Sequence, residues 1–194
     1  MSTSTGKGRT VTAPVWLLDF DGVINAISKR GDRNVWDDWE FARIDHPQEA
    51  GHSLPLLWSP TVVQVVSDAV DAGVNVVWLS TWREDTRILP TVIDGLPELP
   101  WWDEQTLIEA GHRLDPLNVL HQRWKAQVAM AMVPDGAPLL WTDDNLDFGI
   151  VRLAERTWLS KRPGGSTTVV PHETIGLSKK NVRVIREWLD DFAR

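Results

Sequence analysis

The stretch "VWLLDFDGVIN", Val15 to Asn25, joins a short apolar run to two aspartates that are separated by a single residue. The run is rich in Val, Leu and Trp and does not alternate with polar residues, which predicts a strand covered on both faces of a sheet. Two carboxylates this close together repel each other. Asp19 and Asp21 therefore predict a cation or another counter-charge at the end of this strand.

Similar runs recur along the chain and predict further buried strands, at Val74–Leu79, Pro138–Thr142 and Thr157–Leu159. Helical patterns separate them, at Pro60–Ala72, Asn118–Met132, Leu146–Arg156 and Ser178–Phe192. Ser59 and Ser178 stand where helix N-caps are expected. An alternation of strands and helices predicts right-handed crossovers and a mostly parallel sheet flanked by helices. The expected fold class is α/β.

Other segments are less regular. Arg83–Gly95 has a helical pattern that Pro90 must kink or split, and Leu107–Ile108 is expected to form a short strand. A hairpin is expected near Trp39–Ile44. The segment Ser160–Ser178 is expected to be a loop.

The chain has 194 residues, of which 42% are hydrophobic, enough for one core. We expect a flexible tail at 1–12 and a single domain at 13–194, with a small insertion at about 23–59. The sequence has no cysteine, which excludes disulfides and thiolate chemistry. It shows no long apolar span and no leader, so we expect a cytoplasmic protein with no membrane association and no obligate protein partner. The net charge of −7 disfavours a general grip on long nucleic acid.

Oxygen-bearing side chains follow three of the predicted strands, namely Asp19 and Asp21, Ser80 and Thr81, and Asp143 and Asp144. The carboxyl ends of parallel strands share one edge of a sheet, where ligands of open α/β folds bind. An all-oxygen set of ligands without histidine or cysteine favours Mg²⁺. A single strand-end aspartate is commonly a turn former or a helix cap. The ordered set is a stronger signal than any of its members.

Four segments resemble, in chain order, the motifs of the haloacid dehalogenase (HAD) superfamily. They are "DFDGVIN", "VVWLST", Lys125 in "RWKAQ", and "LLWTDDN". Arg113, Arg123 and Lys161 remain alternatives to the lysine. Two segments, "VVWLSTW" and "LLWTDDN", are more narrowly similar to HAD domains of the polynucleotide-phosphatase and RNA-repair type. The resemblance implies a Rossmann-like, HAD-like domain, and the short insertion implies that it has no large cap domain.

The resemblance also implies roles for the residues. Asp19 would attack phosphorus, and Asp21 would act as general acid and then as general base. Ser80 and Lys125 would bind the phosphoryl group together with Gly22, and Thr81 is an alternative to Ser80. Mg²⁺ would be held by Asp19, Asp143 and the backbone carbonyl of Asp21, and Asp144 would complete the shell directly, through water or through Lys125.

These roles predict a magnesium-dependent phosphatase that hydrolyses phosphate monoesters through an aspartyl-phosphate intermediate. The resemblance links Asp21 to phosphate esters rather than carbon–halogen bonds. The resemblance implies that a domain without a large cap has an open cleft, which suits bulky substrates. We therefore hypothesise a nucleotide or nucleic-acid end as substrate, stacked on Trp36, Trp39 or Trp82. Two alternatives remain: a phosphorelay receiver-like module and a non-catalytic HAD-fold binding module. The receiver is disfavoured because its paired acids come early in the chain, whereas the adjacent pair here comes last.

Overall fold

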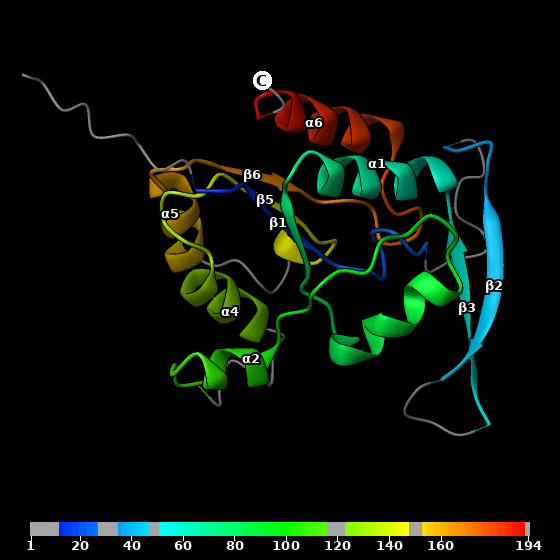
Figure 1. Ribbon diagram of the computed structural model, residues 1–194, viewed down its shortest axis with the longest axis horizontal. Helices are drawn as coiled ribbons and strands as arrows, with labels where there is room; N and C mark the ends of the chain where they lie inside the picture. Colours follow the sequence, from blue (N-terminus) through cyan, green and yellow to red (C-terminus); the bar gives the residue numbers. More distant parts are fainter. Residues whose placement is uncertain (1–11, 27–34, 47–50, 116–122, 148–152, 193–194) are drawn as a thin grey trace, which may run out of the picture.

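The computed structural model describes residues 12–26, 35–46, 51–115, 123–147 and 153–192. Its centre is a parallel sheet in the order β4-β1-β5-β6 (Figure 1). The strands are β1 (Val15–Leu18), β4 (Asn75–Trp78), β5 (Leu139–Thr142) and β6 (Ser166–Val169). Leu18 pairs with Trp78 on one side and with Thr142 on the other. The expectation of an α/β fold with a mostly parallel sheet flanked by helices is confirmed.

Side chains of β1 alternate between two apolar cores, one on each face of the sheet. Trp16 and Leu18 belong to the first core, while Val15 and Leu17 belong to the second. Helices α1 (Pro60–Asp71) and α6 (Lys179–Asp190) supply the first core. Helices α2 (Glu104–Glu109), α4 (Trp124–Met132) and α5 (Leu153–Lys161) supply the second. The sheet is therefore the middle layer of three (Figure 1).

The insertion contains a second, two-stranded sheet. Strands β2 (Glu40–Asp45) and β3 (Ser53–Trp58) pair antiparallel. The hairpin expected near Trp39–Ile44 contains β2, whereas β3 was not predicted. This hairpin lies beside the carboxyl end of the central sheet (Figure 1), close to the residues that end β1.

Two predicted strands are wrong. Thr157–Leu159 lies in α5, whose buried residues Glu155 and Leu159 are four apart, which is the spacing of one helix face. Leu107–Ile108 lies in α2, which begins with a capping box between Asp103 and Thr106.

The fourth strand of the sheet is β6, inside the segment predicted as the loop Ser160–Ser178. Among the described strands it pairs only with β5, which makes it the edge of this sheet, and Val169 is the only buried residue within it. A four-residue polar edge strand carries little hydrophobic pattern for a sequence to reveal.

The helix predictions agree with the structure in part. Both α1 and α6 form where expected, and α4 begins at Trp124, with 118–122 of its predicted span outside the described residues. The span Leu146–Arg156 includes undescribed residues at 148–152, and α5 continues to Lys161. Arg83–Thr91 forms a 3₁₀ helix, η1, with Pro90 inside it. Residues 1–11 of the predicted tail lie outside the described residues.

Helix α1 is capped differently from the prediction. Ser59 precedes Pro60, but its side chain makes no capping hydrogen bond. Its hydroxyl instead donates to Asp38 Oδ1 at 2.6 Å, and Asp38 Oδ2 accepts from the amide of Thr61 at 2.9 Å. Asp38 thus satisfies a free N–H of the first turn from outside the helix. Ser178 caps α6 as predicted, through a capping box with Asn181.

No helix in the part of the chain that the structure describes combines the length and apolar character needed to cross a bilayer.

Candidate functional site

The ends of β1, β4 and β5 meet at one edge of the sheet. The amide of Leu79 donates to Leu18 O at 2.8 Å, and the amide of Asp19 donates to Thr142 O at 3.0 Å. Asp19 is therefore flanked by the residues that follow β4 and β5. The chain runs from β1 to β4 on one side and then crosses to β5 on the other, so strand order reverses at β1. Such a reversal is where open α/β sheets bind ligands.

Three buried carboxylates gather at this edge. Asp19, Asp143 and Asp144 each place one carboxylate oxygen within 4.8 Å of the other two. At an effective dielectric of 20, two unit charges about 4 Å apart interact by about 4 kcal/mol, so three ionised acids at these separations repel strongly. The cluster needs positive charge if it is to stay ionised.

Lys125 supplies part of that charge. Its ammonium Nζ lies 2.8 Å from Asp19 Oδ2 and 2.7 Å from Asp143 Oδ2, and the side chain is 1% exposed. Burial alone lowers the pKa of Lys125, but the two carboxylates outweigh burial and raise this pKa above its ordinary value. The raised pKa keeps Lys125 positively charged at neutral pH. The first turn of α4 places its side chain at this edge of the sheet. Of the alternatives considered, Arg123 instead pairs with Glu155 at 3.2 Å.

Lys125 is the cation paired with this cluster among the described residues, and one ammonium does not balance three carboxylates. Burial, followed by the charge of Asp19, raises the pKa of Asp143 to about 7. The same two causes raise the pKa of Asp144 to about 6. Both raised pKa values mean that the loss of a proton, which adds a negative charge, is unfavourable at this site. A cluster of oxygen ligands with uncompensated negative charge fits a hard divalent cation such as Mg²⁺.

Gly22 brings the backbone against this cluster. Its φ is +69°, in the left-handed region, and a Cβ built there would lie 2.7 Å from Asp144 Cγ. A side chain at this position would meet both backbone strain and a clash with a candidate metal ligand. Glycine therefore allows the loop after β1 to approach Asp144.

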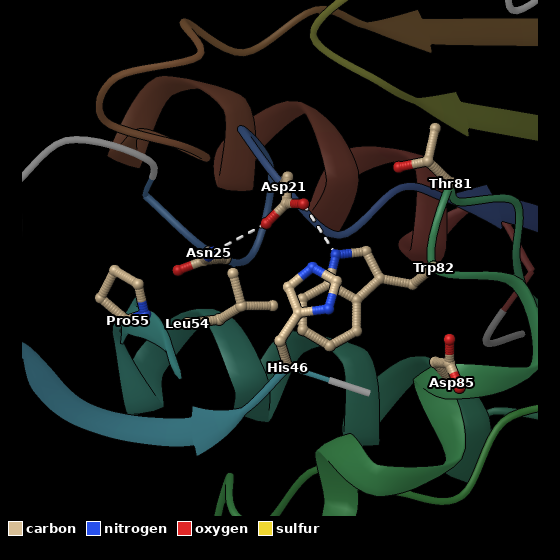
Figure 2. Close-up of a pocket in the computed structure, with 8 residues that line it drawn as sticks. All are labelled: Asp21, Asn25, His46, Leu54, Pro55, Thr81, Trp82 and Asp85. Atoms are coloured by element: carbon tan, nitrogen blue, oxygen red, sulfur yellow. Dashed lines mark hydrogen bonds between the residues drawn. The ribbon is translucent and has the colours of Figure 1, made fainter. Parts of the chain in front are cut away.

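The side chain of Asp21 has its own partners, separate from the three clustered carboxylates. Its Oδ1 accepts from Asn25 Nδ2 and its Oδ2 accepts from Trp82 Nε1, both at 2.7 Å (Figure 2). Burial raises the pKa of Asp21, and this effect is larger than the lowering of the pKa by the two hydrogen bonds. A buried carboxyl with a raised pKa is suited to proton transfer.

Ser80 and Thr81 differ in environment. Ser80 is buried after β4, and its Oγ accepts weakly from the amide of Trp82 at 3.4 Å. A hydroxyl that accepts one hydrogen bond can still donate its proton. Thr81 is exposed and lines a pocket. The hydroxyl of Ser80 is therefore buried at the end of β4, whereas the side chain of Thr81 lines the pocket.

A pocket of about 240 Å³ lies beside Asp21 (Figure 2). It is lined by residues that follow β1 and β4 and by residues of the hairpin: Asp21, Asn25, His46, Leu54, Pro55, Thr81, Trp82 and Asp85. The insertion therefore forms one wall of a cavity whose opposite wall carries the candidate acid.

The role of Asn25 was missed from the sequence, and the three tryptophans expected to stack on a ligand differ in their surroundings. Asn25 ends the opening motif and gave a signal by position, but its contact with Asp21 was not foreseen. Trp36, expected to stack on a ligand, is 6% exposed and donates its indole N–H to Leu177 O at 2.7 Å, so it is a core residue. Trp82 lines the pocket and also holds Asp21. Trp39 is half-buried and packs against the first core.

Comparison of the sequence with models of known protein families and with curated proteins finds no match.

Proposed function

We propose that the protein is a magnesium-dependent phosphatase of the HAD type, which hydrolyses phosphate monoesters through an aspartyl-phosphate intermediate. The observation that carries the proposal is Lys125, whose ammonium joins Asp19 and Asp143 next to Asp144 at the carboxyl end of a parallel sheet. This arrangement combines a buried carboxylate nucleophile with fixed positive charge, the two requirements for phosphoryl transfer by a side chain.

In the first step a carboxylate oxygen of Asp19 attacks phosphorus and the bond from phosphorus to the ester oxygen breaks. The leaving oxygen takes a proton from Asp21, so an alcohol departs and the phosphoryl group remains on Asp19. The raised pKa of Asp21 favours its protonated form at the start of this step. Asn25 and Trp82 hold its carboxyl in place through both oxygens.

In the second step water attacks phosphorus and gives its proton to Asp21. The bond from phosphorus to Asp19 breaks, inorganic phosphate leaves, and both aspartates return to their starting states. Lys125 and the hydroxyl of Ser80 would bind phosphoryl oxygens throughout, with Thr81 as the alternative hydroxyl. Such positioning and charge stabilisation account for most of the catalysis of phosphoryl transfer.

The residues that would hold Mg²⁺ are Asp19, Asp143 and Asp144, together with the backbone carbonyl of Asp21. When bound, the ion would neutralise phosphoryl charge that one lysine cannot balance. The carboxylate cluster and its raised pKa values support this assignment.

The hairpin of β2 and β3 would act as a small cap, with no large cap domain. A pocket wall built by so short an insertion leaves the cleft accessible, which supports a nucleotide or nucleic-acid end as substrate. Trp82 is the remaining candidate for contact with that substrate, since it lines the pocket.

The test is a phosphatase assay with an aryl phosphate and Mg²⁺. Asp19→Asn should lower kcat by roughly 10³-fold or more, because the amide cannot accept the phosphoryl group. Asp147→Asn is a matched control, since this carboxylate lies just beyond the site and is 66% exposed. EDTA should abolish turnover by the unmodified chain.

Three outcomes would contradict the proposal. Activity that survives Asp19→Asn would exclude the covalent intermediate. One labelled aspartate per chain without turnover would support the receiver-like module. Binding of phosphate esters with neither label nor turnover would support the non-catalytic module.

A further inference from the structure

Arg83 connects the two elements that carry the candidate phosphoryl ligands. We infer that it is a positioning residue, which fixes the hydroxyl of Ser80 and the ammonium of Lys125 relative to each other. The inference rests on the proposed function, because the two groups matter together only if they bind the same phosphoryl group. It adds to that function a residue that acts through others rather than by contact with the substrate.

The backbone at Arg83 is held in an unusual conformation. Its φ is +50°, and among the described residues Arg83 is the only non-glycine residue with a positive φ. This conformation is unfavourable for a residue with a Cβ. Strain of this kind persists where the surrounding structure enforces it, often at functional sites. The amide of Arg83 donates to Ser80 O at 3.0 Å, so Arg83 closes a tight turn that begins at Ser80.

The guanidinium of Arg83 is fixed by a bidentate ion pair. Its Nε donates to Glu104 Oε2 at 2.9 Å, and its Nη2 donates to Glu104 Oε1 at 2.7 Å. Glu104 belongs to the first turn of α2, and its side chain is 15% exposed. Two parallel hydrogen bonds from a planar guanidinium set its orientation as well as its distance. The side chain of Arg83 therefore ties the turn after β4 to α2.

The same guanidinium lies over the ring of Trp124. Its Cζ is 5.4 Å from the ring centroid, which is within the range of a cation–π contact. Trp124 is buried and is the first residue of α4, directly before Lys125. Helices α2 and α4 also pack against each other (Figure 1). One side chain thus connects the turn that begins at Ser80 with the first turn of the helix that places Lys125.

The relative position of Ser80 and Lys125 matters for the proposed reaction. The two groups would bind oxygens of one phosphoryl group, although they come from separate elements. Phosphoryl transfer depends mainly on positioning and charge, and a misplacement of about 1 Å can lower the rate by about a hundredfold. The side chain of Arg83 is 42% exposed, and an ion pair at such a position adds little stability. The strained turn and the two contacts of Arg83 are therefore explained by the placement that they enforce.

The experiment removes the side chain of Arg83 without straining the turn. Glycine adopts a positive φ readily, so Arg83→Gly should leave the backbone of the turn in place. With p-nitrophenyl phosphate and Mg²⁺, we expect kcat to fall by about tenfold to a hundredfold. The inhibition constant of inorganic phosphate should rise by about threefold or more, because the two groups are no longer preorganised for one anion. Scanning fluorimetry checks that the variant is folded at the assay temperature.

Arg87→Ala is the matched control. Arg87 lies four residues further along η1, pairs with Glu84 at 3.4 Å and lies over the ring of Trp101 at 5.2 Å, so it makes the same two kinds of contact. Trp101 is not next to a candidate site residue in the chain, whereas Trp124 is. Arg87→Ala should therefore leave kcat and the inhibition constant of phosphate within about twofold of the values of the unmodified chain.

Glu104→Gln tests whether Arg83 acts through its ion pair. The amide keeps the size of the side chain and one acceptor oxygen, so kcat should fall by a smaller factor in the same direction. In the double variant kcat should be no lower than in Arg83→Gly alone, because both changes remove the same interaction. Glu104→Gln also decides the question if Arg83→Gly does not fold.

An unchanged kcat in Glu104→Gln would overturn the positioning role. Combined with a loss in Arg83→Gly, it would mean that Arg83 contacts the substrate itself. Equal effects of Arg83→Gly and Arg87→Ala would also overturn the inference. Absence of turnover by the unmodified chain would instead remove the proposed function, and the inference with it.

Discussion

Among the side chains of the candidate site, Lys125 is the one on which the arrangement of the carboxylates depends most. It lies 2.8 Å from Asp19 and 2.7 Å from Asp143, and it is almost completely buried. Desolvation of a lysine is costly, and only paired carboxylates make it tolerable. Lys125 in turn acts against the rise in the pKa of Asp143 that burial and the charge of Asp19 cause. A buried arrangement of this kind adds little net stability, which favours the interpretation that it is retained for chemistry.

Gly22 is the second residue with a role that substitution can isolate. Gly22→Ala should destabilise the fold by about 1–3 kcal/mol and weaken Mg²⁺ binding, because the φ of +69° is unfavourable for alanine and the new Cβ meets Asp144 at 2.7 Å. Urea denaturation gives the first effect and the thermal shift on adding Mg²⁺ gives the second.

Gly111→Ala is the matched control for this substitution. Gly111 has a φ of +85° with nothing within 4 Å of a built Cβ, so alanine there should cost backbone strain alone and leave Mg²⁺ binding intact. Equal loss of Mg²⁺ response in both variants would show that Gly22 has no special relation to Asp144.

Among the secondary structure elements, α1 shows how a distant residue can complete a local motif. Asp38 accepts hydrogen bonds from Ser59 Oγ at 2.6 Å, Thr61 Oγ1 at 2.6 Å and the amide of Thr61 at 2.9 Å. The carboxylate therefore ties the insertion to the start of the helix. It takes the role that Ser59 was expected to have.

Asp38→Ala should lower the free energy of unfolding by about 1–2 kcal/mol, as loss of a helix cap does. Asp37→Ala is the matched control, because Asp37 has a 93% exposed side chain whose carboxylate lies 3.6 Å from the ammonium of Lys179. Urea denaturation of both variants measures the difference. Equal stability of the two would mean that Asp38 contributes no cap.

At the scale of the whole molecule, the acid cluster makes the stability of the fold depend on pH, and it would couple stability to the proposed binding of Mg²⁺. The pKa of Asp143 is raised to about 7 and that of Asp144 to about 6, from an ordinary value of 3.8. A raised pKa means that the folded state holds these protons more tightly than the unfolded chain. Without metal, the resulting stability is fully present below about pH 4 and is lost as pH rises towards 7.

Mg²⁺ should reverse this dependence, because it binds the deprotonated carboxylates and competes with protons. At an Mg²⁺ concentration about 100-fold above Kd, we expect the melting temperature to rise by roughly 5–10 °C at pH 8. The rise should be much smaller at pH 5, where Asp143 and Asp144 are protonated. Scanning fluorimetry at the two pH values measures both shifts. Asp143→Asn should remove the shift at pH 8, and a pH-independent shift would place Mg²⁺ elsewhere.

Much of the fold could be predicted because buried strands and helices have recognisable local patterns of apolar residues. Continuous apolar runs identified β1, β4 and β5, since strands covered on both faces cannot alternate. The edge strand β6 was not predicted from the sequence, because Val169 is the only buried residue within it. Helix α5 was mistaken in part for a strand because three residues are too few to show a period.

The order of residues along the chain was sufficient to identify the acids after β1 and β5 and to nominate Lys125. It could not show that Lys125 contacts both Asp19 and Asp143, that Trp82 and Asn25 hold Asp21, or that Trp36 is buried. Each of these facts is a contact between distant parts of the chain or a consequence of such packing. Local sequence encodes which residues prefer to be buried, whereas their partners are set by how helices and hairpin pack on the sheet.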